Sequence, residues 1–206
     1  MFKNYELYLS QINSKLEDFF ERQKPYIHCK KGCAKCCKNS EFPYTRLEIT
    51  YLLSGFLTLD DETKQKIENN ISKTVEEKKN FKGGGKFRYD CPFLIDDICS
   101  VYPYRGVLCR TFGLLSNDPK TGKIRAPFCS HEGLNYSCFS DPETKTFSAE
   151  KIRDNKIDVD PLIFNIDYLM LTDSDFEKCF NIKFGERKAL IDWFLVDDNK
   201  DKTNAS

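Results

Sequence analysis

The stretch Cys29-Lys30-Lys31-Gly32-Cys33-Ala34-Lys35-Cys36-Cys37 places four thiols within nine residues, at C-x3-C-x2-C-C spacing. Thiolates are the soft ligands that zinc and iron-sulfur clusters prefer. In a straight helix Cys29 and Cys37 would lie roughly 12 Å apart, whereas the sulfurs on one zinc ion lie within about 4 Å of each other. We therefore expect Gly32 to turn the chain into a loop around a metal, with a helix that begins near Cys36. Otherwise Cys29 and Cys37 serve different metals or different roles.

The length and charge of the chain limit the classes of protein to which it can belong. Its 206 residues suit one domain, and 32 basic residues balance 32 acidic ones, so no general attraction to nucleic acid or to an anionic membrane is expected. No apolar run approaches a membrane span and none resembles a signal sequence. These features predict a cytoplasmic, reducing address, in which ten cysteines indicate metal binding more than disulfides. A secreted, disulfide-bonded framework is the alternative.

The hydrophobic pattern predicts an α+β, mainly helical fold with short β-hairpins around an irregular, cysteine-ligated metal core. We expect a single metal-binding domain over 1–196, with its core at 25–140 and a helical extension at 141–196, followed by a disordered tail at 197–206. Thr45 and Glu48 have the spacing of a capping box. Helices are expected over 4–22, 45–56, 60–79, 162–171, 173–180 and 186–194, and hairpins over 91–102 and near 117–122.

A second group of cysteines follows the glycine run at 83–85, which we interpret as a flexible connector. Cys91 and Cys99 stand at the two ends of a hairpin that turns at Asp96 and Asp97. Cys109, Cys129 and Cys138 come after it. A lone cysteine is more often a small buried apolar residue than a ligand, but this many beside a four-thiol loop indicate ligands.

Several short motifs occur in a fixed order: the four-thiol loop, Cys91-Pro92-Phe93-Leu94, Cys99-Ser100-Val101-Tyr102, Tyr102-x-x-Arg105 and Cys109-Arg110-x-Phe112. Together they resemble the zinc- or iron-chelating cysteine-cluster family of the YkgJ type, over roughly residues 29–129. One departure is Arg105-Gly106, where the family usually has Arg-Pro.

The resemblance implies metal binding and a set of ligands. Carried over residue by residue, that set is Cys29, Cys33, Cys36, Cys37, Cys91, Cys99, Cys109 and, less directly because the downstream spacing varies in the family, Cys129. The metal would be Zn2+ or an iron-sulfur cluster. So many thiolates suit two zinc ions with four each, or one 4Fe-4S cluster with a zinc ion or spare thiols.

Several neighbouring residues have open roles. His28, His131 and Cys138 could complete a site, whereas we expect Cys179 to be a buried residue that does not ligate. Arg105 and Arg110 flank Cys109 and either compensate thiolate charge, recognise an anionic ligand or form ordinary ion pairs. Four lysines around the first loop either offset thiolate charge or are solvated: Lys30, Lys31, Lys35 and Lys38.

The leading functional hypothesis is a cytoplasmic accessory module that binds zinc or an iron-sulfur cluster, with a metal ion and a protein partner or substrate as its partners. The family motif is also similar to that of flagellin lysine N-methylases, which implies an alternative: an iron-sulfur enzyme that uses S-adenosylmethionine in protein methylation. Whether the chain is an enzyme stays open. A radical-enzyme barrel is disfavoured because no alternating series of strands and helices follows the loop. Redox sensing by Cys36 and Cys37 is a third hypothesis.

Overall fold

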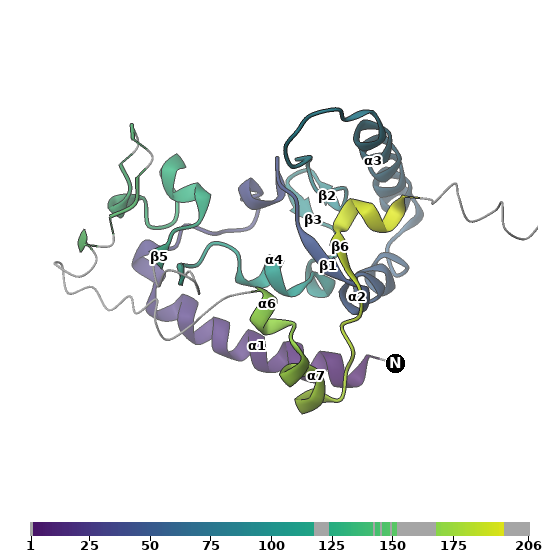
Figure 1. The fold of residues 1–206 in the computed structure, drawn as a ribbon, viewed down its shortest axis with the longest axis horizontal. Coiled ribbons are helices and arrows are strands. Elements are labelled where there is room, and N and C mark those ends of the chain that lie inside the picture. The colour runs from purple at the N-terminus through teal and green to yellow at the C-terminus, as the bar shows by residue number, and fades with distance from the viewer. Residues whose placement is uncertain are drawn as a thin grey trace, which may run out of the picture.

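The computed structural model describes residues 2–117, 124–141, 143–144, 146–148, 150–151 and 168–195 (Figure 1). The α-helices are α1 (Lys3–Arg22), α2 (Arg46–Phe56), α3 (Asp61–Asn80), α4 (Val107–Thr111), α6 (Tyr168–Leu171) and α7 (Ser174–Phe180). The 3-10 helices are η1 (Lys24–Tyr26), η2 (Lys35–Cys37), η3 (Tyr102–Tyr104), η4 (Phe128–Glu132), η5 (Ser137–Phe139) and η6 (Leu190–Phe194).

The strands are short and pair two by two. They are β1 (Pro43–Thr45), β2 (Leu94–Ile95), β3 (Ile98–Cys99), β4 (Ser116–Asn117), β5 (Ile124–Arg125) and β6 (Arg187–Ala189). The pairs β1–β6, β2–β3 and β4–β5 are all antiparallel. The α+β class, mainly helical with short hairpins, is therefore confirmed. Within the described residues, no helix combines the length and apolarity needed to cross a membrane.

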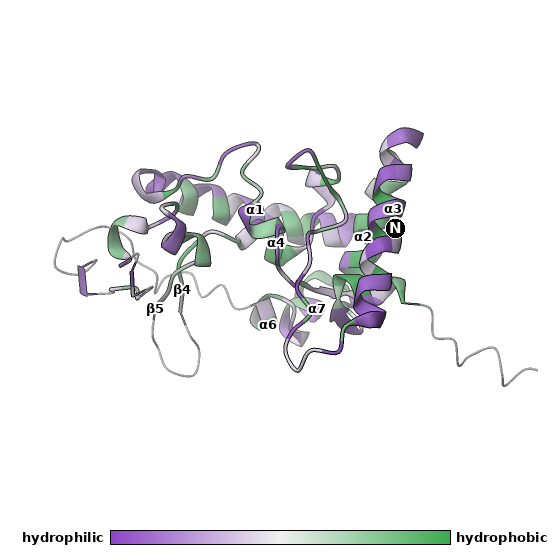
Figure 2. Cartoon of the chain, turned by 90° about the horizontal axis from the view of Figure 1, so that it is seen from above, coloured by the Kyte–Doolittle hydropathy of each residue, from purple (hydrophilic) through white to green (hydrophobic). Residues whose placement is uncertain are grey.

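Helix α1 organises the first hydrophobic core. Apolar side chains recur along one face at helical spacing and are buried: Tyr5, Tyr8, Leu9, Ile12, Leu16 and Phe19. Helices α4 and α7 pack against this face, and Figure 1 shows α7 beside α1 with α4 above it. The alternation of polar and apolar stretches along α1 is visible in Figure 2. The predicted helix over 4–22 is confirmed.

The second core lies between α2, α3 and the hairpin β2–β3. Its buried members include Ile49, Leu52, Ile67 and Phe93, and three cysteines of the second group pack against it, namely Cys91, Cys99 and Cys109. Helix α3 contributes only a narrow apolar strip, with Ile67 fully buried, as its sparse apolar pattern predicts. The second group of cysteines is thus supported by a packed core.

The C-terminal part corrects one prediction. A helix over 186–194 is wrong, because residues 187–189 form strand β6, paired with β1 in the register Pro43 to Ala189. Only 190–194 turn helically, as η6, and the Trp193 indole Nε1 donates to the Tyr44 carbonyl at 3.1 Å. The extension at 141–196 is therefore not wholly helical, and its end returns to the core.

Other C-terminal predictions have mixed outcomes. The helix over 173–180 is confirmed as α7, with Asp173 as its N-cap. Of the helix expected over 162–171, the described part is α6. Residues 162–167, most of 149–160, residues 118–123 of the hairpin expected near 117–122, and the tail expected at 197–206 lie outside the described residues.

Candidate metal centre

The first thiol loop turns as its sequence predicts. Gly32 has a φ of +86°, a conformation that glycine adopts without strain, and the Cys33 amide donates to the Lys30 carbonyl at 2.9 Å. One helical turn, η2, then carries Cys36 and Cys37. Their Sγ atoms lie 3.9 Å apart, which is close to the separation expected for two thiolates on one zinc ion.

A short backbone ladder joins this loop to the second group of cysteines. The Cys91 amide donates to the Cys37 carbonyl at 2.8 Å, and Ser40 and Tyr89 exchange two backbone hydrogen bonds of 3.0 and 3.1 Å. The Asn39 amide adds a bond of 2.9 Å to the Asp90 carboxylate. The chain therefore brings Cys37 and Cys91 together through its backbone, independently of any ligand.

The predicted hairpin between Cys91 and Cys99 is confirmed. Asp96 and Asp97 have φ values of 48° and 61°, so both lie in the left-handed region, as a two-residue turn of this kind requires. The pairing sets Leu94 opposite Cys99. Lys38 from the first loop reaches Asp97 at 2.6 Å, so the turn and the loop also meet at the surface.

Cys109 is positioned by the start of α4. Glu48 accepts the Val107 amide at 2.9 Å, and the Tyr44 hydroxyl accepts the Gly106 amide at 3.2 Å. Gly106 has a φ of −65°, the value a proline would impose, so the departure from the family's Arg-Pro preserves the turn. A Cβ at Gly106 would approach the Tyr44 ring to 2.9 Å, which explains the glycine.

The eight predicted ligands form one electrostatically coupled group. A charge on Cys36 raises the pKa of five other cysteines: Cys29, Cys91, Cys99, Cys109 and Cys129. In the same way, a charge on Cys37 raises the pKa of Cys36. A charge on Cys33 raises the pKa of Cys29. Such coupling falls with distance, and its direction agrees with the backbone bond that joins the loop of Cys37 to the segment of Cys91.

Partial burial acts on the same thiols, of which Cys129 is buried, Cys29 is exposed and the others are half-buried. It is the first cause of the raised pKa values of Cys29, Cys91 and Cys99, and it raises the pKa of Cys109 to about 12 and that of Cys129 to about 11. For Cys36 the hydrogen bond with Cys37 is the larger cause, ahead of burial. Partly buried thiols with raised pKa values ionise more readily beside a compensating cation.

The thiols are gathered without being in coordination geometry. Over the described residues, no group of three or more His, Cys, Asp or Glu side chains is placed to hold one metal ion as it stands. All ten cysteines are free, so the disulfide framework is absent from this structure. Metal binding would therefore require the side chains of the thiol group to move together.

Asn135 is a residue of the site that sequence reasoning missed. It is 1% exposed, its Nδ2 lies 3.1 Å from Cys29 Sγ and donates to the Gly113 carbonyl at 2.8 Å, and its Oδ1 accepts the His28 amide at 2.7 Å. Gly113 has a φ of +96°, and a Cβ there would lie 2.9 Å from Nδ2 and 3.1 Å from Sγ. Nothing local in the sequence marks this asparagine.

The two arginines beside Cys109 differ in role. Arg105 stacks over Tyr102 at 3.6 Å, its Nε is buried without a partner among the described residues, and its charge lowers the pKa of Cys29, Cys36, Cys99 and Cys109. In the described part of the chain neither Arg105 nor Arg110 forms an ion pair with a carboxylate. The direction of these pKa shifts agrees with charge compensation, one of the roles expected for Arg105.

The remaining candidates separate from the group. His28 is exposed and the His131 ring lies 3.1 Å from the Ser140 hydroxyl. Cys138 and Cys179 are exposed; Cys29 is exposed as well, but its sulfur contacts Asn135. The expectation that Cys179 is buried is wrong, because α7 turns Phe176 and Phe180 toward α1 instead. Lys35 pairs with Glu132 at 3.1 Å.

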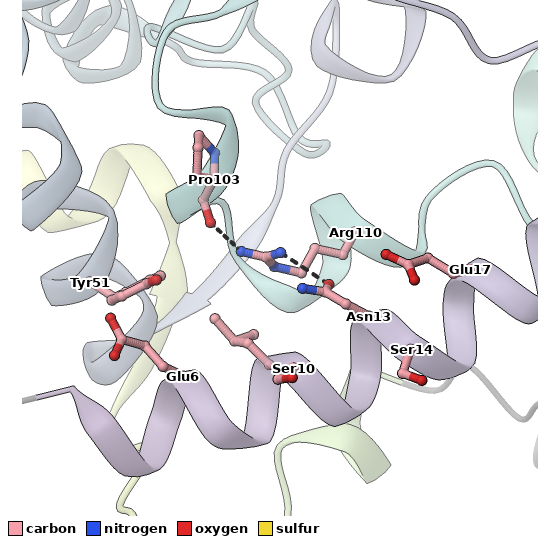
Figure 3. A pocket seen from close by; sticks show the side chains of 9 residues that line it. Glu6, Ser10, Asn13, Ser14, Glu17, Tyr51, Pro103 and Arg110 are labelled. Carbon is pink, nitrogen blue, oxygen red and sulfur yellow. Dashed lines mark hydrogen bonds between the residues drawn. The ribbon is translucent and has the colours of Figure 1, made fainter.

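Arg110 lines a polar cleft of about 340 Å³ along α1 (Figure 3). The residue is 8% exposed, and its guanidinium donates to the carbonyls of Pro103 and Arg105 and to Asn13. Burial lowers the pKa of Arg110. Figure 3 shows carboxylates of Glu6 and Glu17 on either side of it. No cysteine lines this cleft, so it is separate from the thiol group.

Comparison with known proteins supports the metal reading. No curated protein and no solved structure matches the chain. The family model CxxCxxCC, which describes a zinc- or iron-chelating domain, matches residues 28–130, half of the chain. The first spacing here, C-x3-C, is one residue longer than in that name. The chain therefore belongs to the CxxCxxCC family of zinc- or iron-chelating domains.

Proposed function

We propose that the eight coupled cysteines form a thiolate centre for zinc or an iron-sulfur cluster, and that the domain acts as an accessory metal-binding module in the cytoplasm. The observation that supports this proposal is the backbone bond of 2.8 Å from the Cys91 amide to the Cys37 carbonyl, which joins the four-thiol loop to the hairpin of Cys91 and Cys99. Thiolates gathered from these segments would repel one another unless a cation joined them.

The coupling also suggests two groups of thiols that share the Cys36–Cys37 pair. Cys129 is affected by Cys29 and Cys36, and Cys29 by Cys33. Separately, Cys91 is affected by Cys109 and Cys99. Two sites with four thiolates each would therefore divide Cys36 and Cys37 between them, which is the arrangement expected for two zinc ions.

The donors fit either metal. All are sulfurs, the softest ligands that proteins offer, and Arg105 supplies positive charge against the excess of thiolates. When bound, zinc would link segments that are far apart in sequence and contribute to folding. The alternative, an iron-sulfur enzyme that uses S-adenosylmethionine, requires an open position beside the thiols, and the cleft along α1 does not supply one because it contains no cysteine.

The test is metal content and an ultraviolet-visible spectrum on protein purified without oxygen, for the native chain and for Cys36→Ser. We expect the native protein to carry about two zinc ions, or to be brown with absorption near ~400 nm, and Cys36→Ser to lose most of the metal. Cys179→Ser is the matched control, since Cys179 is an exposed thiol outside the predicted ligand set. This variant should retain the metal. Native protein that binds neither metal would overturn the proposal.

A further inference from the structure

Two buried polar side chains point a hydrogen-bond donor at the sulfur of a predicted ligand. Asn135, 1% exposed, holds its Nδ2 at 3.1 Å from Cys29 Sγ. Tyr44, 2% exposed, holds its hydroxyl at 3.3 Å from Cys109 Sγ. Sulfur is a weak acceptor as a thiol, whereas an ionised acceptor forms hydrogen bonds about twice as strong. Both contacts therefore gain in strength if the sulfurs are thiolates.

The orientation of the Asn135 amide is determined by its other contacts. Its Oδ1 faces the His28 backbone N–H at 2.7 Å, which can only donate, and its Nδ2 faces the Gly113 carbonyl at 2.8 Å, which can only accept. Exchanging oxygen and nitrogen would break both bonds. The second N–H of the amide is thus left to point at Cys29.

The hydroxyl of Tyr44 is oriented in the same manner. It accepts the Gly106 backbone N–H at 3.2 Å, so its single proton remains for Cys109. A thiolate bound to a metal carries no proton, and Tyr44 must then be the donor. Cys29 stands in the first thiol loop and Cys109 in α4, so the two donors face predicted ligands from separate segments of the chain.

We propose that Asn135 and Tyr44 are positioning residues of the metal centre, which hold Cys29 and Cys109 for coordination and stabilise their negative charge through N–H···S and O–H···S hydrogen bonds. This inference rests on the proposed function, since it needs both cysteines to be ligands. Residues that orient metal ligands in this way commonly change metal affinity by about 10- to 100-fold when they are replaced. Asn135 lies beyond the segment matched by the family model.

The deciding experiment compares Tyr44→Phe with the native chain. Zinc affinity is measured by competition with a chromophoric chelator, and cobalt is added as a spectroscopic probe of thiolate coordination. We expect unchanged metal stoichiometry, about tenfold weaker zinc binding and a shifted sulfur-to-cobalt charge-transfer band. Tyr8→Phe is the matched control, because it removes a buried hydroxyl that donates to the Leu171 carbonyl at 2.5 Å and should leave zinc affinity unchanged.

Asn135→Asp provides a second variant. It keeps the acceptor for His28 but replaces the donor with a negative oxygen against Cys29, so the loss of affinity should exceed that of Tyr44→Phe. Thermal melting with and without zinc distinguishes a structural role of Asn135 from a positioning role. If the role is positioning, the substitution lowers mainly the melting temperature of the zinc-bound protein. An equal decrease of both melting temperatures would show a purely structural role and overturn the inference.

If Asn135→Asp does not fold, the zinc affinity of Tyr44→Phe is sufficient to test the inference. Native zinc affinity in Tyr44→Phe would overturn the inference and leave the proposed function standing. A native chain that binds no metal would instead overturn both.

Discussion

The carboxylate of Glu48 accepts the backbone N–H of Val107 at 2.9 Å, across 59 residues of sequence. Its other oxygen accepts the amide and hydroxyl of Thr45, each at 2.8 Å, and the hydroxyl of Tyr168 at 2.6 Å. Glu48 is 1% exposed, and it lies at the N-termini of both α2 and α4, where helix dipoles favour a negative charge. One buried carboxylate thus joins the capping box of α2 to the helix that carries Cys109.

Replacing Glu48 with alanine should therefore destabilise the protein strongly. The change leaves buried donors of Thr45, Val107 and Tyr168 without an acceptor, and we expect a loss of about 3 kcal/mol or more in the free energy of unfolding. Urea denaturation measures it. The control is Asp60→Ala, which removes the exposed N-cap of α3 and should cost about 1 kcal/mol. Equal losses in the two variants would contradict the role given to Glu48.

Gly113→Ala should disturb the metal centre more than alanine at other glycines. Gly113 combines a φ of +96° with close approach to Asn135 and Cys29, Gly133 has a φ of +77° with open space, and Gly84 has open space and no such φ. We expect little effect at Gly84, about 1 kcal/mol at Gly133 from backbone strain, and a larger loss with weaker metal binding at Gly113. Thermal melting and zinc competition test this order, and comparable values for Gly113 and Gly133 would exclude the steric argument.

Alkaline pH should destabilise the fold through its buried tyrosines. Burial raises the pKa values of Tyr5, Tyr8 and Tyr168, so near pH ~10 these tyrosines ionise in the unfolded chain and stay protonated in the folded one. The unfolded state then binds fewer protons, so this stabilisation is fully present below pH ~10 and is lost as pH rises beyond it, by about 1.4 kcal/mol per pH unit for each tyrosine.

Urea denaturation between pH ~8 and ~11 measures this dependence. Tyr8→Phe should reduce the slope by about one proton. An unchanged slope in that variant would show that Tyr8 does not titrate in this way.

Removal of metal should increase local opening of the cysteine-bearing segments more than that of the hydrophobic core around α1. The ladder of Ser40, Tyr89 and Cys91 is short and lies between thiol-bearing segments, whereas α1 is packed by apolar side chains. We expect chelation to accelerate amide hydrogen exchange more at 33–40 and 89–99 than along α1. Uniformly faster exchange over the described chain would instead show that the two regions unfold as one unit.

Local signals in the sequence predict the local structure correctly. The capping box of Thr45 and Glu48, the turn at Asp96 and Asp97 and the amphipathic face of α1 depend on residues within a few positions of one another. Short-range hydrogen bonds and side-chain periodicity determine such features, so the sequence pattern is sufficient to predict them.

Features that depend on distant residues are not encoded in any local pattern of the sequence. Residues 187–189 form a strand because β1 offers hydrogen bonds about 140 positions earlier, an effect that overrides local helical preference. Asn135 belongs to the centre only because folding brings Cys29 and Gly113 to it. Cys179 is exposed because α7 packs through Phe176 and Phe180, a choice of face that its own short sequence does not determine.

The bond between Asn135 and Cys29 spans 106 residues, and this separation has a consequence for protein synthesis. At about 5–20 residues per second, the ribosome adds Asn135 roughly 5–20 s after Cys29. During that interval the first four thiols are present in the growing chain without the amide that orients Cys29. Tight metal capture is therefore expected to follow synthesis of both segments, and a nascent chain that takes up metal earlier would hold it with weaker, exchangeable coordination.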